Sequence, residues 1–189
     1  YDKTNVWENE RLMRYAPRYL IEPTALRRST APESHYNHIE VAKYAKELRD
    51  NGVRVLIGAH GQREGLAAHW EMWMMNQGGF TPWESLRGAT YDGAKALGMD
   101  QDLGSIEKGK LADIAIIEGD VLSDIRRSEY VAYTMQNGRL YDTKTMNEVK
   151  TGDFKAKPLF FNRLEINAMP TATAQKQKEK AEKYHWTHH

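Results

Sequence analysis

The sequence predicts an α/β fold up to about residue 100, followed by a small β part. An amphipathic helix leads through a glycine turn into a short aliphatic strand, Val53–Ile57, and the two together make half of a parallel α/β unit. Two further helices are expected after that strand. Beyond Gly98, glycine turns and alternating apolar residues replace the helical spacing, so we place the boundary near residue 100.

Composition narrows the classes of partner. The 189 residues carry 27 Lys and Arg against 26 Asp and Glu, and this balance gives no electrostatic case for nucleic acid or an anionic membrane. The absence of cysteine excludes disulfides and thiolate metal sites, which leaves His, Asp and Glu as the strong metal ligands. No apolar run approaches the roughly 20 residues that span a bilayer. Because the sequence opens at Tyr1 without methionine, we expect a processed or truncated product.

The first half of the chain is expected to hold the helices. Residues 1–33 mix aromatic, arginine and proline residues without periodicity, and one short helix is predicted at residues 9–15. In "HYNHIEVAKYAKELRDNG", apolar residues recur at i, i+3 spacing before a terminal glycine, which predicts an amphipathic helix that stops at Gly52. The run Val53–Ile57 lacks polar alternation, as is typical of a strand covered on both faces.

Two more helices and three strands are predicted further along. "GLAAHWEMWMMNQGG" reads as a helix ended by glycine, and "TPWESLRG" opens with Thr81 as N-cap and Glu84 three residues later. This last helix is expected to continue or restart up to Leu97. Ile114–Ile117 is a predicted strand, and "YVAYTMQNGRLYD" predicts two strands joined by an Asn-Gly hairpin turn. The polar tail "TATAQKQKEKAEKYHWTHH" is either a frayed helix or disordered.

Two helices beside one buried strand cannot close a sheet, so the α/β part needs partner strands that this sequence does not contain. The stretch "TPWESLRGATYDGAKALGMDQDLGSIEKGKLADIAIIEGDVLSDI" resembles the C-terminal end of the amidohydrolase superfamily. "GAHGQREGLAAHWEMWMMNQGG" is similar to the branch of that superfamily fused to an N-terminal TolB-type β-propeller. The residues that match the C-terminal amidohydrolase pattern in the first of these two stretches are Gly104, Ser105, Ile106, Gly109, Lys110, Ala112 and Asp113.

The resemblance implies a fold class: α/β, the C-terminal fragment of a (β/α)8 TIM-like barrel, with its last strand and helices, plus part of a small β-sandwich. Residues 1–100 would be the barrel portion, 101–150 the composite sandwich portion and 151–189 a C-terminal extension. Such barrels carry one or two divalent metals, and we expect zinc in the full-length protein. Most metal ligands would lie upstream of Tyr1, so this chain alone is expected not to assemble the metal centre. A periplasmic or secreted location is also expected from the resemblance.

His60 follows the predicted strand in "VLIGAHG", where the family usually has an aspartate in the pattern "VALGTD". In the family that aspartate touches the metal and takes a proton from the attacking water. A neutral imidazole can also contact the metal or accept the proton, but its charge and basicity differ from those of a carboxylate. Two interpretations stay open: His60 is a catalytic base, metal ligand or substrate contact, or it is a histidine hydrogen-bonded within a loop.

Other candidate residues surround His60 in the sequence. Gln62, Arg63 and Glu64 lie in "GQREG", which would be a βα-loop on the catalytic face, where they could contact substrate or form an exposed loop. His69 could reach the pocket from the first helical turn, or pack at the helix start. The pair His35 and His38 could form a surface metal site, although no third ligand is near in sequence. Trp70, Met72, Trp73, Met74 and Met75 are expected to be helix-packing core rather than a ligand cage.

The leading hypothesis is that the chain is the C-terminal segment of a metal-dependent amidohydrolase acting on amide, peptide-like or cyclic C–N bonds. It is expected to be inactive without the upstream barrel. The expected substrate is a small molecule or a peptide-like compound. The alternative is a binding or assembly module without catalysis of its own, which completes a barrel with a partner chain or forms a homo-oligomer with open sheet edges paired.

Overall fold

The computed structural model describes residues 6, 9–17, 21, 32–59, 65–159 and 161. The chain divides into two units, Tyr1–Ala156 and Lys157–His189, and the helices and strands that follow belong to the first. The predicted polar tail at residues 171–189 lies outside the described residues. The predicted division near residues 100 and 150 stays a prediction.

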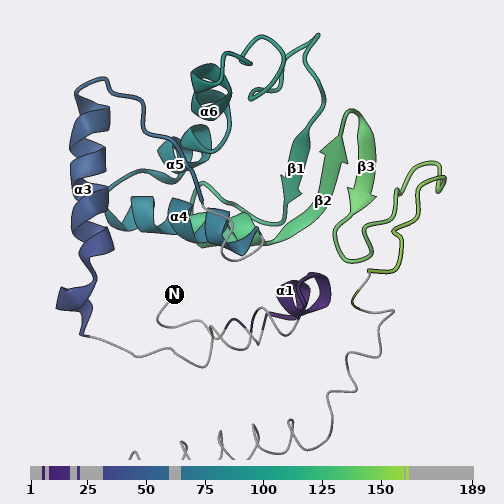
Figure 1. Ribbon diagram of the computed structural model, residues 1–189. Helices are drawn as coiled ribbons and strands as arrows, with labels where there is room; N and C mark the ends of the chain where they lie inside the picture. Colours follow the sequence, from purple (N-terminus) through teal and green to yellow (C-terminus); the bar gives the residue numbers. More distant parts are fainter. Residues whose placement is uncertain are drawn as a thin grey trace, which may run out of the picture. The chain divides into compact units, whose positions relative to one another are not determined.

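Helices α1 (Glu10–Tyr15), α3 (Asn37–Asp50) and α4 (Leu66–Gln77) lie where the sequence predicts them (Figure 1). The short 3-10 helix η2 (Glu33–His35), just before α3, was not predicted. The Asn9 side chain accepts a hydrogen bond from the backbone of Leu12 and so caps the start of α1. After α3 the chain turns at Gly52, whose φ of 88° lies in the left-handed region that favours glycine.

The predicted third helix restarts rather than continues, giving α5 (Pro82–Gly88) and α6 (Tyr91–Ala96). The Thr81 hydroxyl accepts a hydrogen bond from the Glu84 backbone, and the Glu84 carboxylate accepts one from the Thr81 backbone. This is the capping box that the sequence predicted, and it satisfies two backbone donors at the start of α5.

A three-stranded antiparallel sheet forms the second half, in the order β1 (Ile114–Ile117), β2 (Val131–Gln136) and β3 (Arg139–Asp142). The 3-10 helix η3 (Ile125–Glu129) connects β1 to β2. Asn137 and Gly138 both have positive φ, 47° and 79°, which confirms the predicted hairpin turn. The Asp113 carboxylate accepts a hydrogen bond from the Asn137 backbone at 2.6 Å, so this residue of the family-like motif supports the turn.

The predicted strand Val53–Ile57 is not formed in this chain, and that prediction was wrong. The described segment 53–59 has neither helical nor strand structure, and Val53 is 49% exposed. A strand exists only through hydrogen bonds to a neighbouring strand, and within the described part of the chain no strand lies beside this segment. Figure 1 shows the segment running from the end of α3 past α5 towards α4.

The hydrophobic core lies where α1, α4 and η3 meet. Its α4 side consists of Leu66, Trp70, Met72 and Trp73, all at most 9% exposed, and Met74 packs against it. This confirms that the buried Trp and Met residues of α4 are packing core. The remaining core residues are Val6, Leu12, Ala16, Ile21 and Ile125.

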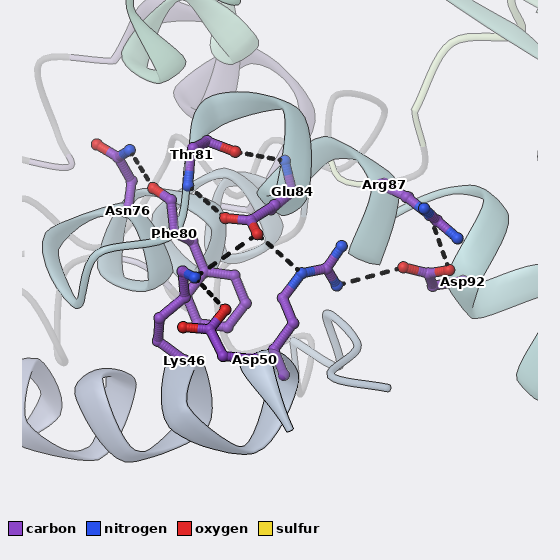
Figure 2. Close-up of polar contacts among 9 residues, drawn as sticks. Lys46, Asp50, Asn76, Phe80, Thr81, Glu84, Arg87 and Asp92 are labelled. Atoms are coloured by element: carbon purple, nitrogen blue, oxygen red, sulfur yellow. Dashed lines mark hydrogen bonds and ion pairs between the residues drawn. The ribbon is translucent and has the colours of Figure 1, made fainter. Parts of the chain in front are cut away.

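A network of charged side chains joins α3 to α5 and α6 (Figure 2). The Arg49 guanidinium lies 3.3 Å from both the Glu84 and the Asp92 carboxylates, and the Arg87 Nε donates to Asp92 at 3.0 Å. Lys46 pairs with Asp50 on its own helix and lies 3.7 Å from Glu84. Burial alone would raise the pKa of Glu84, but the hydrogen bonds from Thr81 and the Lys46 charge hold it below its usual value.

The family-like loop between α6 and β1 is held by Lys110. Its ammonium donates to the Asp100 carbonyl at 2.6 Å and to the Ser105 hydroxyl at 2.5 Å, while lying 3.2 Å from the Glu107 carboxylate. Gly104 has φ 88°, and a Cβ there would overlap the side chain of Ala94 in α6. Gly104, Ser105 and Lys110 of the matched motif are therefore structural here: they fold the loop and pack it on α6.

Candidate functional site

Most of the predicted site lies in a segment that the structure does not describe. His60, Gln62, Arg63 and Glu64 fall within residues 60–64, outside the described residues. Their roles as catalytic, metal-binding or substrate-binding residues remain predictions. Both flanks are described: Gly58 and Ala59 precede the segment, and Gly65, with φ 79°, leads into α4.

His69, a predicted substrate contact, is a partly buried residue on the first turns of α4. Its Nδ1 lies 3.1 Å from the Ser128 hydroxyl oxygen, and that oxygen also accepts a hydrogen bond from the Trp73 indole at 3.0 Å. The same indole donates to the Ile125 carbonyl at 3.0 Å. His69 thereby belongs to a polar contact between α4 and η3, the packing role that the sequence left open as the alternative.

Burial lowers the pKa of His69, and the positive charge of Arg11 on α1 lowers it further. The imidazole is therefore favoured in its neutral form near pH 7. A neutral imidazole hydrogen-bonds well with a serine hydroxyl, because one ring nitrogen can accept its proton. Ser128 is only 1% exposed, so the pair is closed to a substrate at that hydroxyl.

Glu71, two residues after His69, contacts the chain just before the undescribed segment. Its Oε2 accepts a hydrogen bond from the Gly58 backbone N–H at 3.0 Å. The preceding backbone N–H, at Ile57, donates to the Gly88 carbonyl at the end of α5 at 3.4 Å. Helices α4 and α5 thus hold the end of segment 53–59 through one side chain and one backbone group.

The described residues do not fit a metal centre. Among them, no three His, Asp or Glu side chains lie close enough together to hold a metal ion. His38, part of the predicted surface pair, has its Nε2 3.1 Å from the Gln77 amide oxygen at the end of α4. His60 lies outside the described residues, so the structure leaves its metal-binding role as a prediction.

Two surface pockets lie elsewhere on this unit. One of about 390 Å³ adjoins η3, and another of about 390 Å³ adjoins α5 and α6. Neither is lined by His69 or Glu71. The first is lined by Trp73, Asp124, Arg126, Arg127, Glu129 and Tyr130, and the second by Trp83, Leu86, Arg87, Thr90 and Tyr91.

Sequence reasoning missed two residues that the structure places next to predicted ones. Ser128 lies 59 positions from its partner His69, and nothing in the local pattern around "IRRSEY" points to that contact. Glu71 lies two positions after His69 on one helix, so the two side chains point about 200° apart and cannot chelate one metal ion together. Its hydrogen bond to Gly58 spans 13 positions and depends on how α4 packs against segment 53–59.

Within the described part of the chain, no helix is both long and apolar enough to cross a membrane. A family model described as the amidohydrolase family matches residues 19–141. The matched region contains segment 53–59, helices α3 to α6 and the sheet up to Tyr141 in β3. No match was found among curated proteins.

Solved structures of amidohydrolases and prolidases resemble parts of this chain. A Xaa-Pro dipeptidase with methionine bound in its active site is 28% identical, with a TM-score of 0.50, over 65% of this chain and 28% of that one. An amidohydrolase is 25% identical, with a TM-score of 0.45, over 60% of this chain and 30% of its own. Molinate hydrolase is 19% identical, with a TM-score of 0.46, over 69% of this chain and 31% of its own.

This chain therefore spans about 30% of the length of the solved structures that it matches. The family's proteins generally bind divalent metals. Because the family match covers well over half of the residues and includes both the Lys110 loop and segment 53–59, this chain belongs to the amidohydrolase family.

Proposed function

We propose that the chain is the C-terminal part of a metal-dependent hydrolase that cleaves amide, peptide-like or cyclic C–N bonds. The observation that carries the proposal is the family match over residues 19–141. The 28% share of the dipeptidase covered by this chain supports the view that most of the barrel comes from elsewhere in the protein. A TolB-type propeller upstream and a periplasmic or secreted location belong to the same proposal, and rest on the "GAHGQREGLAAHWEMW" motif.

The proposed substrate class is a peptide-like amide. The likeness to a Xaa-Pro dipeptidase makes an Xaa-Pro dipeptide, such as Met-Pro, the first compound to test. Its scissile amide has a carbonyl that water must attack, and a general base near that water speeds the step about 10²- to 10⁴-fold.

His60 is the proposed base. It follows segment 53–59 directly after Ala59, and the resemblance of "VLIGAHG" to the family pattern "VALGTD" places it where that pattern has an aspartate. A neutral imidazole there would accept the proton of the attacking water, while Gln62, Arg63 and Glu64 would contact the substrate. The proposed zinc would supply Lewis-acid polarisation when bound, and its ligands would come mostly from outside the described residues.

Replacing His60 in the full-length protein tests the proposal. For His60→Ala we expect kcat/KM on Met-Pro to fall by about 10²-fold or more, because the base is lost. Bound zinc, measured by elemental analysis, separates the two proposed roles: it falls if His60 is a ligand and stays if His60 is only the base. A rate and a zinc content both equal to wild type would contradict the assignment of His60. His35→Ala, at an exposed histidine of η2, is the matched control for the rate.

A second candidate function is favoured by segment 53–59. Its backbone N–H groups at Arg54, Val55 and Leu56 have no hydrogen-bond acceptor among the described residues. Such an edge suits an assembly module that completes a barrel with a separate partner chain. If the chain is an assembly module, a second polypeptide should copurify with it in a fixed ratio. If the leading proposal is right, the missing strands belong to the same polypeptide.

A further inference from the structure

The end of segment 53–59 is held by few contacts. Gly58 and Ala59 are both exposed, so packing does little to fix them. The hydrogen bond from Ile57 to Gly88 is long, at 3.4 Å, whereas that from Gly58 to Glu71 is 3.0 Å. The Glu71 carboxylate is thus the better of the two hydrogen-bond acceptors at this point, two residues before His60.

The hydrogen bond from the Gly58 N–H to the Glu71 carboxylate belongs to a strong class. A backbone N–H that donates to a carboxylate makes a charge-assisted hydrogen bond, which is stronger than one to a neutral carbonyl. Glu71 makes no ion pair with another described residue, so its charge is not shared with a lysine or arginine there. It projects from α4, and that helix is anchored in the core by Trp70, Met72 and Trp73. A side chain on a rigid helix that hydrogen-bonds to the end of a loop restricts where that loop can lie. Supporting contacts of this kind hold site residues in their productive geometry.

We propose that Glu71 is a positioning residue: its carboxylate holds the Gly58 backbone and fixes where the chain leaves segment 53–59 on the way to His60. This inference rests on the proposed function, because it assumes that His60 acts at the active site. It assigns Glu71 no contact with substrate or with the reacting atoms. Its effect is on geometry, and a displacement of about 1 Å near a reacting group can lower a rate about 10²-fold.

Two variants of Glu71 in the full-length protein test the inference with Met-Pro as the probe substrate. Glu71→Ala removes the acceptor, and we expect kcat to fall about 10- to 100-fold with KM changed less than about threefold. Glu71→Gln keeps a side-chain oxygen as acceptor, so kcat should recover to within about threefold of wild type. Glu40→Ala is the matched control, because it removes an exposed carboxylate that pairs with Lys43 on α3 and leaves the Gly58 contact intact.

Three kinetic outcomes would overturn the inference. Equal activity of Glu71→Ala and wild type would show that the contact positions nothing. Equal losses in Glu71→Ala and Glu71→Gln would assign the effect to the negative charge rather than to the held backbone. A loss in Glu40→Ala as large as that in Glu71→Ala would show that removing any helix-surface carboxylate has this effect.

Amide hydrogen exchange at Gly58 gives a reading that does not depend on activity. We expect exchange at least about tenfold faster in Glu71→Ala than in wild type, and close to wild type in Glu71→Gln. Unchanged exchange in Glu71→Ala would overturn the inference even if His60 proves essential. Faster exchange together with a fully active His60→Ala variant would instead refute the proposed function and leave only the structural contact.

Discussion

At the scale of single residues, His69 is the predicted substrate contact that the structure describes, and its protonation is coupled to folding. Its pKa is lowered in the folded protein by burial and by Arg11, from a usual value of 6.5. As the pH falls below 6.5, the unfolded chain takes up a proton at this histidine before the folded chain does. The stability that the neutral imidazole contributes is therefore present above pH 6.5, and is lost as the pH falls through the lowered pKa.

This coupling predicts a pH-dependent effect of His69→Gln on stability. Between pH 7.5 and pH 5.5 the free energy of unfolding should fall more for wild type than for His69→Gln, since the variant has no imidazole to protonate. Urea unfolding at the two pH values measures the difference, with His35→Gln as the control for losing an exposed histidine. Parallel losses in wild type and His69→Gln would contradict the lowered pKa.

Single residues were predictable from the sequence where their partners are close along the chain. Thr81 and Glu84 are three positions apart, and the Asn137-Gly138 turn is local, so both were predicted and both are confirmed. Ser128 and Glu71 were not, because their contacts depend on tertiary packing. A side chain's partner 13 or 59 positions away is set by how helices meet, and a single sequence carries no local signal for that.

At the scale of elements, the packing of α3 on α4 depends on a glycine. Gly78 ends α4, and a Cβ at that position would overlap the Cβ and the backbone of Ala42 in α3. Its φ of −82° suits any residue, so the requirement for glycine there is steric rather than conformational.

We predict that Gly78→Ala lowers the free energy of unfolding by about 1–3 kcal/mol, since the two helices must move apart to admit a methyl group. Gly93→Ala is the matched control, because a Cβ there meets its nearest atom, the Gly88 carbonyl oxygen, at 3.4 Å. Urea unfolding of both variants checks the prediction. A Gly78→Ala variant as stable as the control would show that the α3 and α4 contact yields easily.

Helices and strands were predictable where the sequence pattern that specifies them is local, and were not where they depend on contacts with distant residues. Helical spacing, caps and the hairpin turn predicted α1, α3, α4, α5 and the three strands of the sheet. The predicted strand Val53–Ile57 is not formed, because an apolar run of this kind needs a strand beside it and cover on both faces, and the described part of the chain supplies no such strand. The network of Arg49, Glu84 and Asp92 was not predicted either, since ion pairs between helices require the helices to be placed first.

At the scale of the whole molecule, the exposed apolar residues of the α/β part agree with the proposal that more protein covers it. Val41, Tyr44 and Leu48 on α3 are 64%, 64% and 53% exposed, and Val53 is 49% exposed. Leu48 belongs to the apolar face that the helical spacing predicted. In a barrel, the end of such a helix and the strand after it would pack against neighbouring strands and helices.

Segment 53–59 should therefore become a hydrogen-bonded strand in the full-length protein. We predict that the amides of Arg54, Val55 and Leu56 exchange at least about 10²-fold more slowly there than in this chain expressed alone, because neighbouring strands would supply their acceptors. Hydrogen exchange followed by mass spectrometry measures both samples, and the Val53 amide, which already donates to the Leu48 carbonyl at 3.0 Å, is the internal reference. Equally fast exchange in the full-length protein would exclude this segment as a barrel strand, whereas protection that arises only after a separate chain is added would favour the assembly module.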